Sequence, residues 1–225
     1  IDRLSLRTGS IAQPVRIYGS NFSTTLAATD IDFGRGVTVT RVTSATPALV
    51  TVEVNVANDA TVGARDLFVS GALYKGALVV YDKIDSIKVA PNWNMARVGG
   101  AVFPKMLAQF DAVAFHNGAD GKPDTADDLL LGPVEATWSL EEYTATFEDD
   151  DIRFVGEIDP TRGLFTPALD GPNPQRSGNR NNIGDVWVVA VHTPAGGGTP
   201  MRARAHLVVT VPLYMRWDFS TVGGR

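Results

Sequence analysis

The chain contains no cysteine. This absence excludes disulfide bonds, thiolate metal sites, cysteine nucleophiles and the Cys-x-x-Cys-His motif that attaches haem c. It does not fix the cellular compartment, because domains without disulfide bonds fold both in a bacterial periplasm and in a cytosol.

Long apolar segments and helical periodicity are missing as well. No apolar run approaches the roughly 20 residues that span a bilayer, so no membrane association is expected. No signal peptide is visible, and no long stretch shows apolar residues at helical spacing. The chain starts at Ile1 and enters strand-like sequence at once. We therefore expect a processed or excised C-terminal piece of a longer protein.

Excess positive charge is also absent. The chain has 20 basic and 25 acidic residues, a formal net charge of -5. A surface of this kind does not attract phosphates, so nucleic acid is not an expected partner. The charge is unevenly distributed, because residues 1–82 carry seven basic and seven acidic residues. The net negative charge therefore lies in residues 83–225.

What the sequence does contain is a period of two. Residues 50–56 are the clearest example, with four valines that alternate with Thr51, Glu53 and Asn55. This alternation predicts a half-buried β-strand. Similar patterns predict strands near 15–17, 37–40, 67–69, 78–81, 84–90, 107–116, 133–140, 152–158, 185–192 and 203–214. Their spacing is typical of β-sandwiches, so we predict an all-β chain of two tandem immunoglobulin-like β-sandwich domains.

The predicted domain boundary lies near Asp82-Lys83. One strand pattern ends there, and another begins almost immediately. We therefore assign residues 1–82 to the first sandwich and residues 83–225 to a second sandwich with long loops. A junction this short predicts a fixed relation between the two domains.

The first of two long loops runs from Asn117 to Asp128. It contains several hard oxygen ligands, together with glycines that let the backbone curl: Asn117, Gly118, Asp120, Gly121, Asp124, Asp127 and Asp128. A Ca²⁺ site needs such oxygens. The EF-hand pattern is absent, however, and Lys122 lies inside the cluster. The other interpretation is a solvated hairpin loop in which Asp and Asn side chains bond to the backbone.

The second long loop runs from Asp170 to Gly184. Its polar tip consists of Gln175, Arg176, Asn179, Arg180, Asn181 and Asn182. Arg and amide side chains satisfy the backbone groups of a neighbouring protein well, which favours a partner contact. A plain solvated loop explains the same composition.

Other polar residues give weaker signals. His116, His192 and His206 are scattered without a His-x-x-x-His pair, so surface or strand-face positions are favoured over a metal site. The run from Glu148 to Asp151 predicts a solvated edge that discourages aggregation, rather than the paired carboxylates of a glycosidase. No Gly-x-Ser-x-Gly motif occurs, and the glycines at 196–198 predict a hairpin turn.

Four tryptophans complete the set of informative residues. Trp138 and Trp187 lie on alternating strands, where we expect core aromatics of a sandwich. Trp93 and Trp217 lie at segment ends. There they serve either as interface anchors or in ordinary packing.

The N-terminal region resembles the IPT/TIG type of immunoglobulin-like domain. The resemblance rests on the V-x-I-x-G-x-N-F pattern of residues 15–22, the F-G-x-G-V of residues 33–37, and Thr61-Val62-Gly63-Ala64-Arg65-Asp66 before a hairpin. Such motifs are informative about fold and say little about function.

The whole chain is similar to the C-terminal part of the α subunit of bacterial quinohaemoprotein amine dehydrogenase. After the TIG-like unit, the similarity is carried by Lys83-Ile84-Asp85, Asn117-Gly118-Ala119-Asp120-Gly121, Ala136-Thr137-Trp138-Ser139-Leu140 and Asn182-Ile183-Gly184-Asp185-Val186-Trp187-Val188.

The resemblance implies a periplasmic heterotrimer that oxidises primary amines. It implies a dihaem cytochrome c domain in the N-terminal part of the same subunit, a propeller β subunit, and a small γ subunit with cysteine tryptophylquinone. A cysteine-free chain holds neither haem c nor that quinone, so no catalytic, cofactor or metal residue is carried over. The expected role is a structural and subunit-interaction module.

Two other functions remain open from the sequence. One is a secreted or cell-surface binding module, stabilised by calcium in the Asn117–Asp128 loop, that recognises carbohydrate or protein. The other is an enzyme in its own right, for which the sequence gives the least support.

Overall fold

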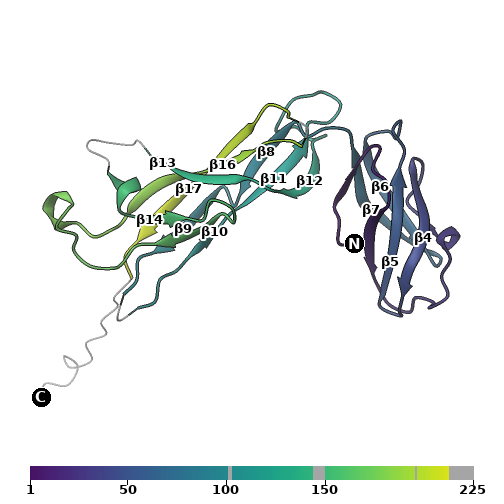
Figure 1. The fold of residues 1–225 in the computed structure, drawn as a ribbon, viewed down its shortest axis with the longest axis horizontal. Coiled ribbons are helices and arrows are strands. Elements are labelled where there is room, and N and C mark those ends of the chain that lie inside the picture. The colour runs from purple at the N-terminus through teal and green to yellow at the C-terminus, as the bar shows by residue number, and fades with distance from the viewer. Residues whose placement is uncertain (101–102, 144–149, 196, 213–225) are drawn as a thin grey trace, which may run out of the picture. The chain divides into compact units, whose positions relative to one another are not determined.

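A computed structural model describes residues 1–100, 103–143, 150–195 and 197–212. As predicted, the fold is all-β and consists of tandem immunoglobulin-like sandwiches (Figure 1). Within the described residues there are strands, three short 3-10 helices and no α-helix. The 3-10 helices are η1 (Ala28–Asp30), η2 (Asp151–Arg153) and η3 (Ser177–Asn179).

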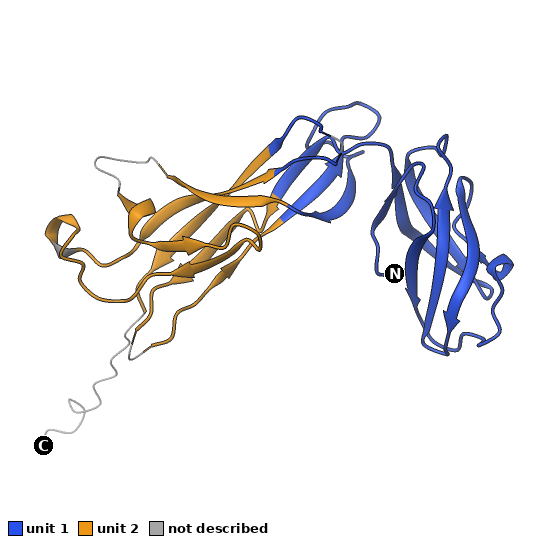
Figure 2. Cartoon of the chain, viewed as in Figure 1, with its two compact units in different colours: residues 1–88, 112–135, 192–201 blue, residues 89–111, 136–191, 202–225 orange. Residues whose placement is uncertain are grey.

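The chain divides into two compact units (Figure 2). Unit 1 consists of residues 1–88, 112–135 and 192–201, and unit 2 of residues 89–111, 136–191 and 202–225. Each unit is therefore built from three separate segments of the sequence. The domain boundary near Asp82-Lys83 stays a prediction.

Two sheets of unit 1 form the N-terminal sandwich. One sheet has the order β1 (Ser5–Arg7), β7 (Ala72–Tyr81), β6 (Gly63–Val69) and β3 (Ile31–Asp32). The other has the order β2 (Gln13–Tyr18), β5 (Leu49–Val56) and β4 (Val37–Ala45). β1 pairs with β7 in parallel, whereas β6 and β7 form an antiparallel hairpin through Ser70-Gly71.

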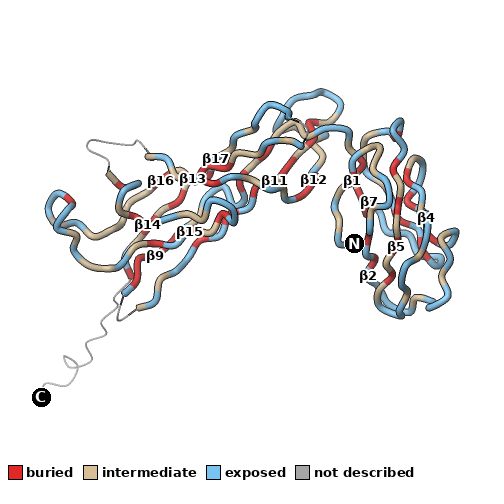
Figure 3. The backbone as a smooth tube through the Cα atoms, in the orientation of Figure 1, coloured by how far each residue is buried: buried red, intermediate tan, exposed pale blue. Residues whose placement is uncertain are grey.

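The core of this sandwich follows from the alternation in the sequence. In β5, the valines at 50, 52, 54 and 56 are buried and the residues between them are half-buried (Figure 3). Phe33 and Leu78 are fully buried in the same cluster. Removing such a side chain from water contributes about 1.5–3 kcal/mol to stability. Every buried member of the cluster lies between Leu6 and Val80.

A third sheet of unit 1 has the order β12 (Leu129–Val134), β11 (Asp111–His116) and β8 (Ser86–Ala90). The backbone N–H of Asp85 donates to the carbonyl of Phe115. This bond ties the start of β8 to the end of β11, and the long Asn117–Asp128 loop connects β11 to β12.

Unit 2 contains two further sheets. The four-stranded sheet has the order β13 (Thr137–Glu142), β16 (Gly184–His192), β17 (Met201–Thr210) and β9 (Trp93–Arg97). The three-stranded sheet has the order β10 (Ala108–Gln109), β15 (Leu164–Pro167) and β14 (Gly156–Ile158). Buried residues alternate along their strands, as in Ala205, Leu207 and Val209 of β17.

The predicted strand at 133–140 is wrong, because the chain changes sheets within it. Residues up to Val134 pair with β11, whereas residues from Thr137 pair with β16. The predicted strand at 152–158 is wrong in its first half, where η2 forms before β14. The short strands β1, β3, β9 and β15 were not predicted. A pattern of two to five residues is too short to show a period.

Both long loops predicted from the sequence connect strands, and the second ends at Gly184, the first residue of β16. Residues 117–128 form turns without a strand, and the second loop contains η3. In the described part of the chain, no helix has the length and apolar character required to cross a membrane.

Candidate functional site

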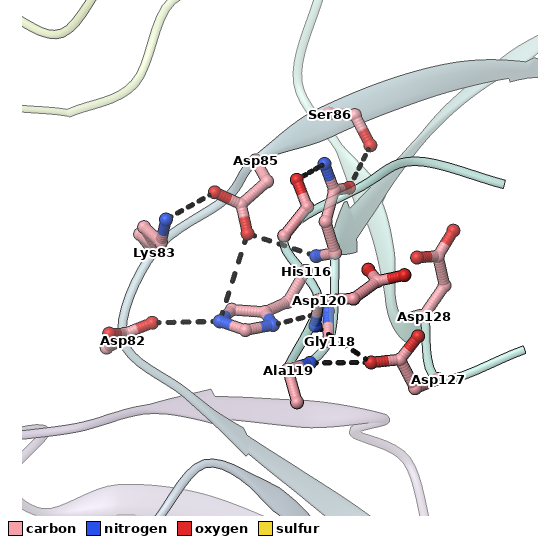
Figure 4. A network of polar contacts seen from close by, with 12 residues as sticks. Asp82, Lys83, Asp85, Ser86, His116, Gly118, Ala119, Asp120, Asp127 and Asp128 are labelled. Atoms are coloured by element: carbon pink, nitrogen blue, oxygen red, sulfur yellow. Dashed lines mark hydrogen bonds and ion pairs between the residues drawn. The ribbon is translucent and has the colours of Figure 1, made fainter. Parts of the chain in front are cut away.

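His116 is the centre of a polar network at the end of β11 (Figure 4). Its side chain is buried, with Nε2 at 3.2 Å from Asp82 Oδ1 and 3.8 Å from Asp85 Oδ2. Nδ1 accepts the backbone N–H of Gly118 at 3.1 Å. Because Nδ1 acts as an acceptor, the neutral ring carries its proton on Nε2, which donates to Asp82.

Asp85 holds the start of the loop to this network. Its Oδ2 accepts the backbone N–H of Asn117 at 3.0 Å, and its Oδ1 lies 2.7 Å from Lys83 Nζ. Burial alone would raise the pKa of Asp85. The hydrogen bonds from Lys83 and Asn117, with the charge of Lys83, outweigh burial and lower the pKa below its ordinary value.

Asn117 is also buried, with 7% of its surface exposed. The hydroxyl of Ser86 donates to Asn117 Oδ1 at 3.0 Å, and Asn117 Nδ2 donates to the carbonyl of Gly121 across a long 3.5 Å. The amide therefore faces β8 and its own loop rather than solvent.

The aspartates of the loop bind its own backbone. Asp127 Oδ2 accepts the N–H groups of Ala119 and Asp120 at 2.6 and 3.2 Å. The Thr125 hydroxyl donates to Asp127 Oδ1 at 2.8 Å. The Thr125 hydroxyl and the two backbone donors lower the pKa of Asp127, because each favours the charged carboxylate.

The remaining carboxylates of the loop are engaged in the same way. Asp128 accepts the N–H of Asp124, and Asp120 accepts the N–H of Lys122, both at 2.8 Å. Asp124 pairs at 2.5 Å with Lys88, whose ammonium also lies over the ring of Phe115. The contacts fit a hairpin loop held by side-chain to backbone turns.

The geometry does not assemble a metal site here. Among the described residues, no group of three or more His, Cys, Asp or Glu side chains is arranged to hold an ion. The hydrogen bonds of His116 disfavour metal binding, because an ion on Nε2 would require the ring proton to be on Nδ1. That proton would then face the N–H of Gly118.

Arg176 fixes the second long loop from inside. Only 1% of its side chain is exposed, and it pairs with Asp150 at 2.8 Å and with Asp151. Its other terminal nitrogen donates to the carbonyls of Asn181 and Ile183. A buried ion pair with this many hydrogen bonds defines one conformation of the loop.

Two predictions are corrected by these contacts. Arg176 does not belong to a polar tip, and Asp151 is buried rather than part of a solvated edge. The reason is mutual neutralisation, because each charge offsets the desolvation of the other. Arg180 is exposed and reaches Asp150 at 3.0 Å. Glu148 and Asp149 of the same run lie outside the described residues.

The rest of the 170–184 loop is polar and closed on itself. Asn181 accepts the N–H of Gly171 and donates to Asp170, and Asn182 accepts from Asn173. Gln175 is exposed. The side chain of Asn179 lies outside the described residues.

An aromatic cluster covers the outer face of the four-stranded sheet. Tyr143 stacks on His206 with ring centroids 4.1 Å apart and lies 4.7 Å from Trp187. The guanidinium of Arg204 lies 4.1 Å above the Trp187 ring, and His206 Nε2 lies 2.7 Å from Asp185. The prediction that Trp187 is a core aromatic is therefore wrong.

The other tryptophans and His192 have separate environments. Trp138 is 5% exposed, which confirms its predicted core position, whereas Trp93 is 50% exposed at the start of β9. Trp217 lies outside the described residues, as does Gly196 of the glycine turn. His192 Nδ1 lies 2.7 Å from the carbonyl of Glu135, so the structure does not bring the three histidines together.

Comparison with protein-family models decides the family. Residues 4–82 match "quinohemoprotein amine dehydrogenase, alpha subunit domain III", and residues 87–221 match domain IV of the same subunit. The chain belongs to the quinohaemoprotein amine dehydrogenase α-subunit family. The resemblance read from the sequence is thereby confirmed over the whole chain.

Other comparisons are less informative. No curated protein sequence matches. Solved structures that resemble the chain include mouse clustered PcdhgC3 EC1-3, at 12% identity, TM-score 0.36, and coverage of 94% of this chain and 66% of that one. Another is titin z1z2 in complex with telethonin, at 13% identity, TM-score 0.25 and coverage of 94% and 93%. At these TM-scores the likenesses do not bear on function.

The His116 network lies where the two family matches meet. Asp82 is the last residue matched to domain III, Asp85 lies between the matches, and His116 belongs to domain IV. The network thus joins the connecting segment to the domain IV region. The contact of His116 with Asp82 and Asp85 is difficult to predict from sequence, because residues 82–85 and 116 are more than 30 positions apart.

The position of the aromatic cluster could have been predicted from the sequence of β16. Asp185 and Trp187 have the same phase in β16, and the residues buried next to them are Val186 and Val188. An aspartate in phase with a tryptophan indicates that both lie on the outer face. No comparable signal marks Arg176, whose burial depends on acidic residues about 25 positions away.

Proposed function

We propose that this chain is a non-catalytic structural and subunit-interaction module of a periplasmic quinohaemoprotein amine dehydrogenase. In this proposal it holds the haem-bearing N-terminal part of its own subunit against the propeller β subunit and the small quinone-bearing γ subunit. The complex as a whole oxidises primary amines, with its haem c and cysteine tryptophylquinone outside this chain.

The observation that carries the proposal is the match to α-subunit domains III and IV. The sequence adds a chemical argument. A chain without cysteine has no thiol to form the thioether bonds of haem c and no thiol to form that quinone cofactor. Rigid positioning is the contribution that remains for such a region. The rates of electron transfer depend on fixed distances between cofactors.

The exposed side of the 170–184 loop is the proposed contact with a partner subunit. Arg176 and Asp151 fix the loop from below, so that Gln175 and Arg180 are presented on a preformed surface. A rigid loop loses little conformational entropy on binding. Its arginine and amide side chains are suited to hydrogen bonds with a partner's backbone.

Purification of the native complex tests the function as a whole. We expect a periplasmic assembly with a haem c spectrum and two further chains, one of them small and quinone-staining. A colourless single chain would contradict the proposal and favour a secreted or cell-surface binding module.

Substitution of the loop surface tests the contact. Alanine at both Gln175 and Arg180, with Arg176 left intact, should weaken co-purification of the partner subunits. The melting temperature of this chain should change no more than in the control variant. Arg41→Ala is the matched control, because Arg41 is an exposed arginine of β4 that pairs with Glu53 of β5. If the double variant assembles like the control, the loop is not the contact.

A further inference from the structure

Asn117 and Gly118 form the one asparagine–glycine pair in the sequence. In such a pair the glycine nitrogen can attack the asparagine side-chain carbonyl, since no Cβ on the second residue obstructs ring closure. The reaction is slow in free peptides because the amide nitrogen is a poor nucleophile. Groups that remove its proton and polarise the carbonyl accelerate such an attack.

The fold places one such group on each reacting atom. His116 Nδ1 accepts the N–H of Gly118 at 3.1 Å, in the position of a general base. The Ser86 hydroxyl donates to Asn117 Oδ1 at 3.0 Å, where negative charge develops during attack. These contacts come from β8 and β11, so the folded chain supplies an arrangement that an isolated peptide lacks.

Asp82 completes the arrangement as a positioning residue. Its Oδ1 lies 3.2 Å from His116 Nε2, which keeps the lone pair on Nδ1 directed at Gly118. A carboxylate in this position also stabilises the imidazolium that forms when Nδ1 takes up a proton. Figure 4 shows Asp82, His116 and Gly118 in this order.

We propose that Asn117 is a self-deamidation site, with His116 as the base and Ser86 as the hydrogen-bond donor to the carbonyl. The nitrogen of Gly118 forms a bond to Cγ of Asn117, and His116 takes the proton. The bond between Cγ and Nδ2 then breaks, and ammonia leaves with the proton returned by His116. A five-membered succinimide remains.

Water completes the conversion. It adds to either carbonyl of the succinimide and opens the ring to aspartate or isoaspartate. The released ammonia takes up the proton of the new carboxylic acid, so the net reaction is amide plus water to carboxylate plus ammonium. The formal net charge changes from -5 to -6.

The consequence is a change in the loop. The new carboxylate belongs to a residue whose own N–H binds Asp85, and it lacks the Nδ2 donor that reached the Gly121 carbonyl. Isoaspartate adds one carbon to the backbone and moves the Gly118 N–H from His116. Like-charge repulsion and the lost hydrogen bonds therefore loosen residues 117–128 irreversibly.

The experiment compares the full chain at neutral pH when folded and when unfolded in urea. Peptide mapping by mass spectrometry follows aspartate and isoaspartate at position 117, and ion exchange follows the added charge. A well-placed general base accelerates a reaction by roughly 100-fold or more. We expect a smaller gain here, with conversion about tenfold faster in the folded chain than in urea. Conversion at an equal or lower rate than in urea overturns the proposal.

Two variants identify the groups. His116→Gln keeps a hydrogen-bond acceptor but removes the base, and Ser86→Ala removes the donor. Each should slow conversion in the folded chain and leave the rate in urea equal to that of the wild type. Circular dichroism checks that each variant folds. If folded His116→Gln converts as fast as wild type, His116 is not the base, and the proposed mechanism fails.

Discussion

Arg176 is the residue on which the 170–184 loop depends most directly. Its guanidinium is almost fully buried against Asp150 and Asp151 and also donates to two backbone carbonyls of the loop. Removing one partner of such a pair leaves an uncompensated buried charge. The cost of a substitution here therefore reflects desolvation as much as the lost contact.

Replacing Arg176 with methionine should lower the free energy of unfolding by about 3–5 kcal/mol. Urea denaturation measures this change. Arg180→Met is the matched control, because Arg180 also pairs with Asp150 but is exposed, and should cost roughly 0–1 kcal/mol. Equal effects of the two substitutions would show that burial does not set the strength of this ion pair.

Asp85 gives a prediction about pH. Its pKa lies below the ordinary 3.8, so the folded state binds its proton less tightly than the unfolded state. Its contribution to stability is therefore fully present above the unfolded-state pKa and is lost as pH falls through the lowered folded-state value. Asp85→Asn should destabilise the chain near neutral pH.

Urea unfolding of wild type and Asp85→Asn at several pH values tests this sign. The difference between them should be largest at neutral pH and shrink in acid. The exposed Asp59 provides the control, since Asp59→Asn should change stability little at any pH. A difference for Asp85→Asn that grows as pH falls would refute the argument.

The 117–128 loop gives a prediction about calcium. Its carboxylates are directed at backbone N–H groups, at Thr125 and at Lys88. These donors compete with a calcium ion for the same carboxylate oxygens. Residue types suitable for calcium thus satisfy the turns of the loop instead.

We therefore expect millimolar calcium and EDTA to give the same melting temperature. A ligand that binds the folded state alone stabilises it by RT ln(1 + [L]/Kd), so a calcium site occupied at millimolar concentration would raise the melting temperature in this assay. A rise of several degrees with calcium, absent with magnesium, would favour the calcium-stabilised binding module.

The whole molecule is best tested by dividing it at the predicted boundary. The buried cluster of the N-terminal sandwich runs from Leu6 to Val80. Its core therefore needs no residue from the remainder of the chain. A fragment of about 80 residues can fold alone, although with modest stability.

Residues 1–82 should accordingly unfold in a single cooperative transition when expressed alone. This fragment contains no tryptophan, so its unfolding in urea cannot be followed by tryptophan fluorescence. Far-UV circular dichroism is the suitable measurement. A broad transition without a folded baseline would place the boundary elsewhere. The matching fragment 1–88 would then show whether the residues beyond Asp82 are required.

The sequence by itself determined the all-β class, the longer strands of the N-terminal sandwich and the family. Alternation at a period of two is a local property, and family motifs are linear, so both survive without coordinates. Trp138 was predicted for the same reason, since its strand has a clear phase.

Tertiary structure decided the rest. The change of sheet between Val134 and Thr137 and the burial of Arg176 both depend on partners distant in sequence. A charged side chain is buried only where an opposite charge lies beside it, and the point at which a chain changes sheets is fixed only by the strands with which it pairs. Neither is encoded in the residues next to it.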